Sequence, residues 1–288
     1  AEDVDEIYNV YVVDDDGKLV GVLPLKNLVI SHPKKKIANI STDEIKSANV
    51  DMPAEDVANA MHKYDLVAIP VVDHIGRLVG KITFDDIVDF IREEAEKDYQ
   101  MISGITEDVE PSDNIWPLTR ARIPWLLIGL VGGILGAQVI GHYEDDIAKF
   151  AGLALFLPLI AAMGGNVGVQ SSAIIVQGLA NKSLGIESTG RKLMKELAVA
   201  VIAGVVCSSL IFLYNLFFSD SWALTMTVSS ALFSVILFAS LFGTFVPLAL
   251  HRFKIDPALA TGPFITTVND IMGIFIYLSI GSIMFDLI

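Results

Sequence analysis

The chain has 288 residues, of which 53% are hydrophobic, and its formal net charge is −14. Residues 1–115 hold 25 of the 34 acidic and 11 of the 20 basic residues, whereas residues 116–288 hold nine of each. The acidic excess excludes nucleic acid as a partner, because phosphates need cationic groups, and the single cysteine excludes an internal disulfide. This division predicts an acidic soluble domain followed by a membrane domain.

The acidic part contains a sequence repeat. VYVVDDDGKLVGVLPLKNLV at 10–29 matches IPVVDHIGRLVGKITFDDIV at 69–88, at an offset of 59 residues. Each copy predicts two short strands joined by a turn with glycine, followed by the start of a helix. Such a pair resembles the CBS domain pair, an α+β module. An amphipathic helix is predicted at 54–64 before the second copy, and we expect the first copy to begin upstream of residue 1.

The last helix of this module is predicted at 84–98 and is strongly acidic. Asp86, Asp89 and Glu93 are spaced three to four residues apart, so they share one face of that helix. Like charges in this arrangement destabilise a helix unless a cation screens them. The face is therefore either a cation site or an ordinary solvated surface. We assign residues 1–98 to the soluble domain and residues 99–122 to a linker or connecting helix.

Five apolar stretches follow and predict an all-α membrane domain at 123–288. The expected spans are 123–141, 147–180, 196–218, 222–250 and 257–286. Basic residues gather between alternate spans, and the positive-inside rule makes those loops cytoplasmic. These residues are Arg120, Arg122, Lys182, Arg191, Lys192, Lys195, Arg252 and Lys254. The acidic loops then lie outside, so we expect a cytoplasmic soluble domain and a C-terminus outside.

The second span contains the polar run PLIAAMGGNVGVQSS at 158–172. Gly164 and Gly165 permit two helices to approach closely. Asn166 either holds helices together or faces an ion path, because a Gly-Gly-Asn step can expose a backbone carbonyl. For Ser171 and Ser172, hydrogen bonding between helices is the simpler interpretation.

The fifth span carries one acidic residue, Asp270, in the run DPALATGPFITTVND. Pro257 suits a helix start, which would put Asp270 about 20 Å along the helix, near the middle of the membrane. A carboxylate at that depth costs roughly 2.5–3.5 kcal/mol. It is expected to face a water-filled cavity or a cation; the alternative is a protonated or asparagine-paired side chain. Pro263 would free backbone carbonyls inside the span.

These features together resemble the MgtE family of magnesium channels over nearly the whole chain. An acidic CBS pair, a linker, five spans, P-x5-GGN-x-G-x-Q in the second span and DPA…TT-x-x-D in the fifth occur in that family's order. The resemblance implies a homodimer in the lipid of the bacterial plasma membrane, with a Mg²⁺ pore on the two-fold axis lined by these two spans. The implied pore or ion-binding residues are Asp270, Asn166, Thr266, Thr267 and Gly165.

The resemblance also implies regulatory Mg²⁺ on the acidic domain. The family's sites match this chain at Asp86, Asp89, Glu94, Asp98, Glu55 and Asp65, and Glu93 shares the acidic helix face. High cytosolic Mg²⁺ would bridge these surfaces and close the pore, and low Mg²⁺ would let repulsion open it. The chain departs from the family pattern at three positions. Some members carry asparagine where this chain has Val169 and Gly262, and one acidic position of the family corresponds to Pro53 here.

Two further functions stay open from the sequence. The first is a carrier that couples divalent-cation transport to Na⁺ or H⁺. The second is a nucleotide sensor, because CBS pairs in many proteins bind adenosine phosphates, and Thr83 and Asp85 resemble the position that holds the ribose. ATP would then modulate transport. We do not expect an enzyme, because the sequence shows no nucleophile–base pair, phosphate-binding glycine loop or zinc constellation.

Overall fold

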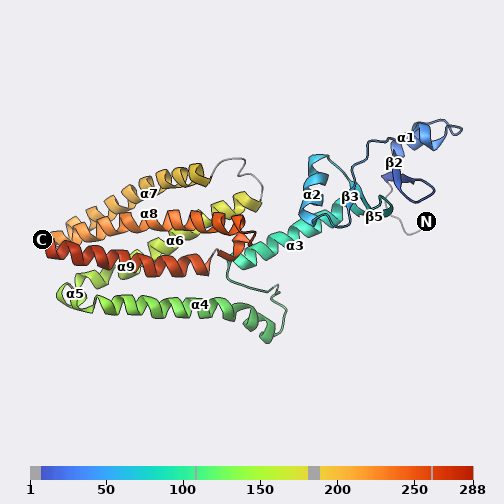
Figure 1. Cartoon of the computed structure of the whole chain (residues 1–288). Coiled ribbons are helices and arrows are strands. Elements are labelled where there is room, and N and C mark those ends of the chain that lie inside the picture. Colours follow the sequence, from blue (N-terminus) through green and yellow to red (C-terminus); the bar gives the residue numbers. More distant parts are fainter. Residues whose placement is uncertain (1–7, 108, 181–188, 261, 288) are drawn as a thin grey trace. The chain divides into compact units, whose positions relative to one another are not determined.

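The computed structural model describes residues 8–107, 109–180, 189–260 and 262–287. The chain divides into two compact units, Ala1–Glu96 and Lys97–Ile288, each of which is described by itself (Figure 1). Lys182, one of the basic residues used to predict the orientation, lies outside the described residues.

The first unit contains two β-hairpins, each followed by a helix. In the first copy the elements are β1 (Asn9–Val13), β2 (Leu19–Pro24) and α1 (Leu25–Ile30), followed by a short 3₁₀ helix at Ile37–Asn39. In the second copy they are β3 (Ala48–Asn49), α2 (Ala54–Lys63), β4 (Ala68–Val72), β5 (Leu78–Thr83) and α3 (Phe84–Ile102). Each hairpin is antiparallel, and β3 pairs in parallel with β4. The predicted α+β fold of this part is confirmed.

The two hairpin turns are built alike and contact each other. Gly17 and Gly76 have φ values of +80° and +86°, a backbone conformation that favours glycine. The N–H of Leu19 donates to the carbonyl of Gly76, and the N–H of Leu78 donates to the carbonyl of Gly17, both at 3.0 Å. The sequence repeat is therefore a structural repeat whose two copies pair through their turns.

The core of the first unit lies between α2 and its sheet. Val57 and Met61, one turn apart in α2, are 2% and 1% exposed. They pack with Ala48, Ile69 and Ile87. The amphipathic helix predicted at 54–64 is confirmed as α2, because its apolar stripe is the face that this core buries.

The second unit is a bundle of long helices. Its elements are α4 (Ile115–His142), α5 (Glu144–Lys149), α6 (Gly152–Ala180), α7 (Thr189–Phe218), α8 (Trp222–Arg252), the 3₁₀ turn η2 (Pro257–Ala260) and α9 (Pro263–Leu287). Five of the described helices, α4, α6, α7, α8 and α9, are long and apolar enough to cross a membrane. The predicted number of spans is confirmed.

Helix α8 lies at the centre of this bundle. It contacts α6, α7 and α9, and its buried side chains include Val228, Val235 and Ile236. Helix α4 lies against α9 at one edge, and α7 lies against α8 at the other (Figure 1). Helices α6 and α9, which carry the predicted ion-path residues, therefore share a contact beside the central helix.

The second long helix starts later than predicted. The sequence predicts a span from residue 147, but α5 ends at Lys149 and Phe150 is not helical, with φ −128° and ψ 71°. Helix α6 begins at Gly152. A Cβ atom added at Gly152 would lie 2.8 Å from Cδ2 of Leu224, so glycine allows the start of α6 to pack closely on α8.

The fifth long helix also starts later than predicted. Pro257 begins the short turn η2, and Pro263 is the first residue of α9, a position that suits its fixed φ and missing N–H. Gly262 precedes it with φ +60°. Asp270 therefore lies about 10 Å from the start of its helix rather than about 20 Å. Pro263 frees no carbonyl inside the helix, because it stands at the helix start.

Helical structure also enters the segment assigned to the linker. Helix α3 continues to Ile102, and α4 already begins at Ile115. Between them, Gly104 has φ +80° and lies against α9, because an added Cβ would be 2.7 Å from Cγ of Pro263. The connection thus contacts the first residue of the helix that carries Asp270.

Candidate functional site

Glycines in α6 bring this helix against the part of α9 that carries Asp270. A Cβ atom added at Gly165 would lie 3.1 Å from Oδ1 of Asp270 and 3.6 Å from Cγ2 of Thr266. A Cβ added at Gly168 would lie 1.8 Å from Nδ2 of Asn269, too close for any side chain. Small residues permit such close approach between membrane helices. Three predicted ion-path residues, Gly165, Thr266 and Asp270, are therefore neighbours.

The Asp270 carboxylate has an open side. Its side chain is half-buried, and Asn166, next to Gly165 in α6, is exposed. Among the described residues, Asp270 has no hydrogen-bond or ion-pair partner. A carboxylate in an apolar bundle without a counter-charge is a strong candidate for cation binding. Carboxylate and amide oxygens are also the hard ligands that Mg²⁺ prefers.

The two threonines before Asp270 contact different neighbours. The hydroxyl of Thr266 donates to the backbone carbonyls of Pro263 (3.0 Å) and Gly262 (3.2 Å). The methyl group of Thr267 packs on α4, because a Cβ added at Gly132 would lie 1.9 Å from its Cγ2. The structure therefore places Thr266 beside Asp270, whereas the Thr267 methyl forms the contact between α4 and α9.

Sequence reasoning missed Asn269, the residue directly before Asp270. Asn269 is 1% exposed, and within the described part of the chain neither polar atom of its amide has a hydrogen-bond partner. Its amide occupies the space that Gly168 leaves open. The sequence feature that could have identified Asn269 is its position directly beside Asp270, as a second polar residue in the run TTVND.

Sequence reasoning also missed a second carboxylate in the bundle, Glu196 of α7. Its Oε1 accepts hydrogen bonds from Ser171 of α6 at 2.6 Å and from Ser240 of α8 at 2.5 Å. The prediction that Ser171 joins helices is confirmed. Ser172 is buried, and no described residue forms a hydrogen bond with its hydroxyl. Glu196 was the first residue of the predicted third span, so its position resembled an ordinary helix boundary.

The side chain of Asp86 caps the start of the acidic helix α3. Oδ2 of Asp86 accepts hydrogen bonds from the hydroxyl (2.6 Å) and the backbone N–H (2.7 Å) of Thr83. Both bonds hold the pKa of Asp86 below its usual value, and the bond from the Thr83 hydroxyl has the larger effect. Two residues predicted to bind metal and nucleotide thus form the helix start, and Asp85 is exposed beside them.

The other predicted regulatory carboxylates do not gather at one place. They are exposed or half-buried, and they are Asp89, Glu93, Glu94, Asp98, Glu55 and Asp65. In the ranges that the structure describes, no group of three or more His, Cys, Asp or Glu side chains is placed to hold a metal ion. One exposed carboxylate of α3, that of Glu96, pairs with Arg92 at 2.9 Å.

Two parts of the chain match known families. Residues 157–280 match MgtE, described as a divalent cation transporter, and residues 37–93 match the CBS domain. Over 98% of its length, the chain is 33% identical to the magnesium transporter MgtE of Bacillus subtilis and 35% identical to that of Enterococcus faecalis. The chain belongs to the MgtE family. It spans 62% of the length of each of these two relatives.

The MgtE match includes the Asp270 site and the Glu196 cluster. It runs from α6 to α9 and so covers Gly165, Ser171, Glu196, Ser240 and Asp270. A solved structure similar to part of the chain is the cytosolic domain of the Mg²⁺ channel MgtE in complex with ATP. That structure is 42% identical with a TM-score of 0.30, and the match covers 31% of this chain and 36% of the other.

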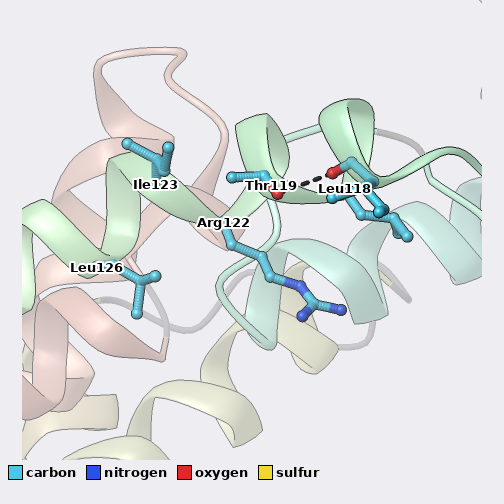
Figure 2. Close-up of a pocket in the computed structure, with 6 residues that line it drawn as sticks. Leu118, Thr119, Arg122, Ile123 and Leu126 are labelled. Carbon is cyan, nitrogen blue, oxygen red and sulfur yellow. Dashed lines mark hydrogen bonds between the residues drawn. The ribbon is translucent and has the colours of Figure 1, made fainter.

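A hollow at the start of α4 lies outside both matched regions. It is lined by Ile115, Leu118, Thr119, Arg122, Ile123 and Leu126. Figure 2 shows these side chains along α4, five of them labelled. The hydroxyl of Thr119 donates to the backbone carbonyl of Ile115 at 2.8 Å. Because every lining residue comes from one helix, the hollow has a single wall, and we assign it no ligand.

Proposed function

We propose that the chain is one subunit of a Mg²⁺-selective channel that admits Mg²⁺ down its electrochemical gradient. The observation that carries the proposal is the carboxylate of Asp270, which is half-buried against Gly165 and has no partner in the described part of the bundle. The magnesium transporters matched over 98% of this chain support it. A protein of this kind moves an ion and is not an enzyme.

A homodimer would bring two such carboxylates together on a two-fold axis. Two like charges repel each other, and a divalent cation between them removes that repulsion. Because Mg²⁺ gives up its waters reluctantly, the ion would pass with most of them and contact Asp270 through water. Asn166 and Thr266 supply further oxygen atoms for those waters.

Regulatory Mg²⁺ would act on the acidic surface of the first unit and α3. The predicted ligands are Asp86, Asp89, Glu93, Glu94, Asp98, Glu55 and Asp65. Proteins often hold Mg²⁺ through only one or two carboxylates, with waters as the other ligands. Such a site does not need three acidic side chains in one place, and the described residues contain no group of three. Such ions close the channel only if they bind the closed state more tightly than the open state.

The distribution of charge supports an orientation in the bacterial plasma membrane. The basic ends of the bundle, with Arg120 and Arg122 in α4 and Arg252 in α8, would face the cytoplasm together with the CBS unit. With five spans, the C-terminus would then lie outside.

Mg²⁺ uptake by an Asp270→Ala variant tests the proposal. We expect uptake to fall at least about tenfold, because the variant removes the only charge proposed to bind the ion. Asp220→Ala is the matched control, since Asp220 is an exposed acidic residue between α7 and α8. Wild-type uptake by Asp270→Ala, in protein inserted at the wild-type level, would refute the pore assignment.

Electrical recordings separate the channel from a coupled carrier. A channel gives resolvable unitary Mg²⁺ currents that persist when Na⁺ and the proton gradient are removed. Uptake that needs one of those gradients and shows no unitary current would replace the channel by an ion-coupled carrier.

A second proposal concerns ATP as a modulator. The CBS match at 37–93 includes Asp85, which is exposed directly after β5, at the position predicted to hold a ribose. Calorimetry of the full-length chain with ATP, compared with Asp85→Ala, tests it. Equal affinities would remove Asp85 from any nucleotide site, and no heat of binding in either protein would remove ATP itself.

A further inference from the structure

The Glu196 cluster joins three helices through one oxygen atom. Oε1 of Glu196 in α7 accepts from Ser171 in α6 and Ser240 in α8, and these two hydroxyls are 3.2 Å from each other. Ser171 is 4% and Ser240 is 1% exposed. Among the described residues, no ion pair to a basic side chain involves Glu196. Hydrogen bonds between polar side chains hold membrane helices together, so these two bonds tie α7 to both neighbours.

The cluster lies within about one turn of a close backbone contact between α6 and α8. A Cβ atom added at Gly243 of α8 would lie 2.4 Å from the backbone oxygen of Gly168 in α6, so the two backbones touch. Ser171 follows Gly168 by three residues, and Ser240 precedes Gly243 by three. Helices α6 and α8 run in the same direction (Figure 1), and the hydroxyls of Ser171 and Ser240 lie 3.2 Å apart. The Glu196 hydrogen bonds therefore hold the two helices together within about one turn of this contact.

The same turn of α6 forms the wall behind the ion-binding carboxylate. Gly168 contacts the amide of Asn269, and Gly165 contacts the carboxylate of Asp270. No side chain separates α6 from α9 at these points. A shift of α6 along or away from α8 therefore changes the packing against Asn269 and Asp270 directly.

We propose that Glu196 is a positioning residue for the ion path. By accepting both serine hydroxyls, it fixes α6 on α8, and α6 in turn fixes the geometry around Asp270. Glu196 does not touch the ion. This inference rests on the proposed function, because it assigns Glu196 a role in the selectivity of the Asp270 site.

The test measures Mg²⁺ transport by the full-length chain in liposomes, as the maximal rate, the apparent KM and the ratio of Mg²⁺ to Co²⁺ rates. Glu196→Ala should raise the apparent KM about tenfold and change the ion ratio, because small misplacements of binding groups have large effects. Glu196→Gln should stay within about threefold of wild type, since its amide oxygen still accepts both hydroxyls. Met194→Ala, 65% exposed on the same helix, is the control and should match wild type.

Four outcomes decide the inference. A KM and an ion ratio unchanged in Glu196→Ala, with only a lower maximal rate, would reduce Glu196 to a fold-stabilising residue and overturn it. Equal losses in Glu196→Gln and Glu196→Ala would overturn the role of the accepted hydroxyls. If Glu196→Ala does not insert, Ser171→Ala/Ser240→Ala removes the same hydrogen bonds and must show the same shifts. Absence of Mg²⁺ transport by the unaltered chain would instead refute the proposed function, independently of Glu196.

Discussion

Two carboxylates of the bundle, those of Glu196 and Asp270, differ in their surroundings. Glu196 and Asp270 each lie seven residues after the first residue of their helices, α7 and α9. Glu196 accepts hydrogen bonds from two buried serines. Asp270 lies against a glycine, is half-buried, and has no partner among the described residues. Similar distance along a helix therefore does not mean similar chemistry.

The comparison shows which carboxylate is available to a ligand. A charge in a membrane domain needs compensation, and the Glu196 oxygen obtains it from Ser171 and Ser240. Asp270 obtains none from the residues that the structure describes, so a cation, water or another chain is the expected source of its compensation. Gly165 places no side chain against the Asp270 carboxylate, so no polar group of α6 at that position satisfies it.

Neutralising the two carboxylates sharpens this comparison most. Asp270→Asn should lower Mg²⁺ uptake at least about tenfold, since a neutral amide cannot compensate the charge of a divalent ion. Glu196→Gln should leave most uptake intact, because its role is to accept hydrogen bonds. Uptake of ²⁵Mg²⁺ into liposomes containing equal amounts of each variant measures both. Equal losses in the two variants would contradict the distinction.

The helix crossing gives the next largest effect. Gly243→Ala places a methyl group against the backbone oxygen of Gly168, so the helices must separate. We expect a loss of about 1–3 kcal/mol of stability, typical of overpacking. Gly133→Ala in α4 is the control, because a Cβ there meets no atom within 4 Å. Thermal unfolding in detergent compares them, and equal stability would show that α6 and α8 do not touch at Gly243.

Much of the fold was predictable, because its signals are local. The repeat around Gly17 and Gly76 predicts both hairpins, and the apolar stretches predict five long helices. The start of α9 was wrong by six residues, since Pro257 and Pro263 both suit a first helical position. Two features of the folded chain mark Pro263 rather than Pro257 as the helix start. Gly104 packs against Pro263, and Gly262 directly before it has a left-handed backbone conformation.

The candidate site was predictable in part. Asp270 is conspicuous, because an acidic residue in an apolar run is rare. The Glu196 cluster depends on three residues from three helices, Ser171, Glu196 and Ser240, and no local pattern connects them. The capping role of Asp86 was visible as threonine followed three residues later by an acidic residue, but the acidic character of the whole helix obscured it.

A variant of Asn269 tests whether the buried amide next to Asp270, which has no described hydrogen-bond partner, serves transport at the cost of stability. Replacing its buried amide with the similar-sized Leu should raise stability by about 1 kcal/mol, because an unpaired buried amide is costly. If Asn269 takes part in transport, the same variant should lower Mg²⁺ uptake. Detergent unfolding and liposome uptake of one preparation measure both. A lower stability would show that the amide has partners, such as water, in the membrane.

The smallest effect concerns the start of α3. Asp86→Ala removes the acceptor of the Thr83 hydrogen bonds and should cost about 0.5–1 kcal/mol of local stability. Because these bonds lower the pKa of Asp86, its contribution is complete above the ordinary aspartate pKa of about 4 and is lost as the pH falls through the lower folded value. Hydrogen exchange of the β5–α3 segment in the full chain, corrected for intrinsic rates, should differ between wild type and variant at pH 6 and converge toward pH 2. Asp85→Ala, which changes an exposed neighbour that takes no part in the Thr83–Asp86 hydrogen bonds, should match wild type throughout. A difference that persists undiminished at pH 2 would mean that the ionised carboxylate is not what stabilises the helix start.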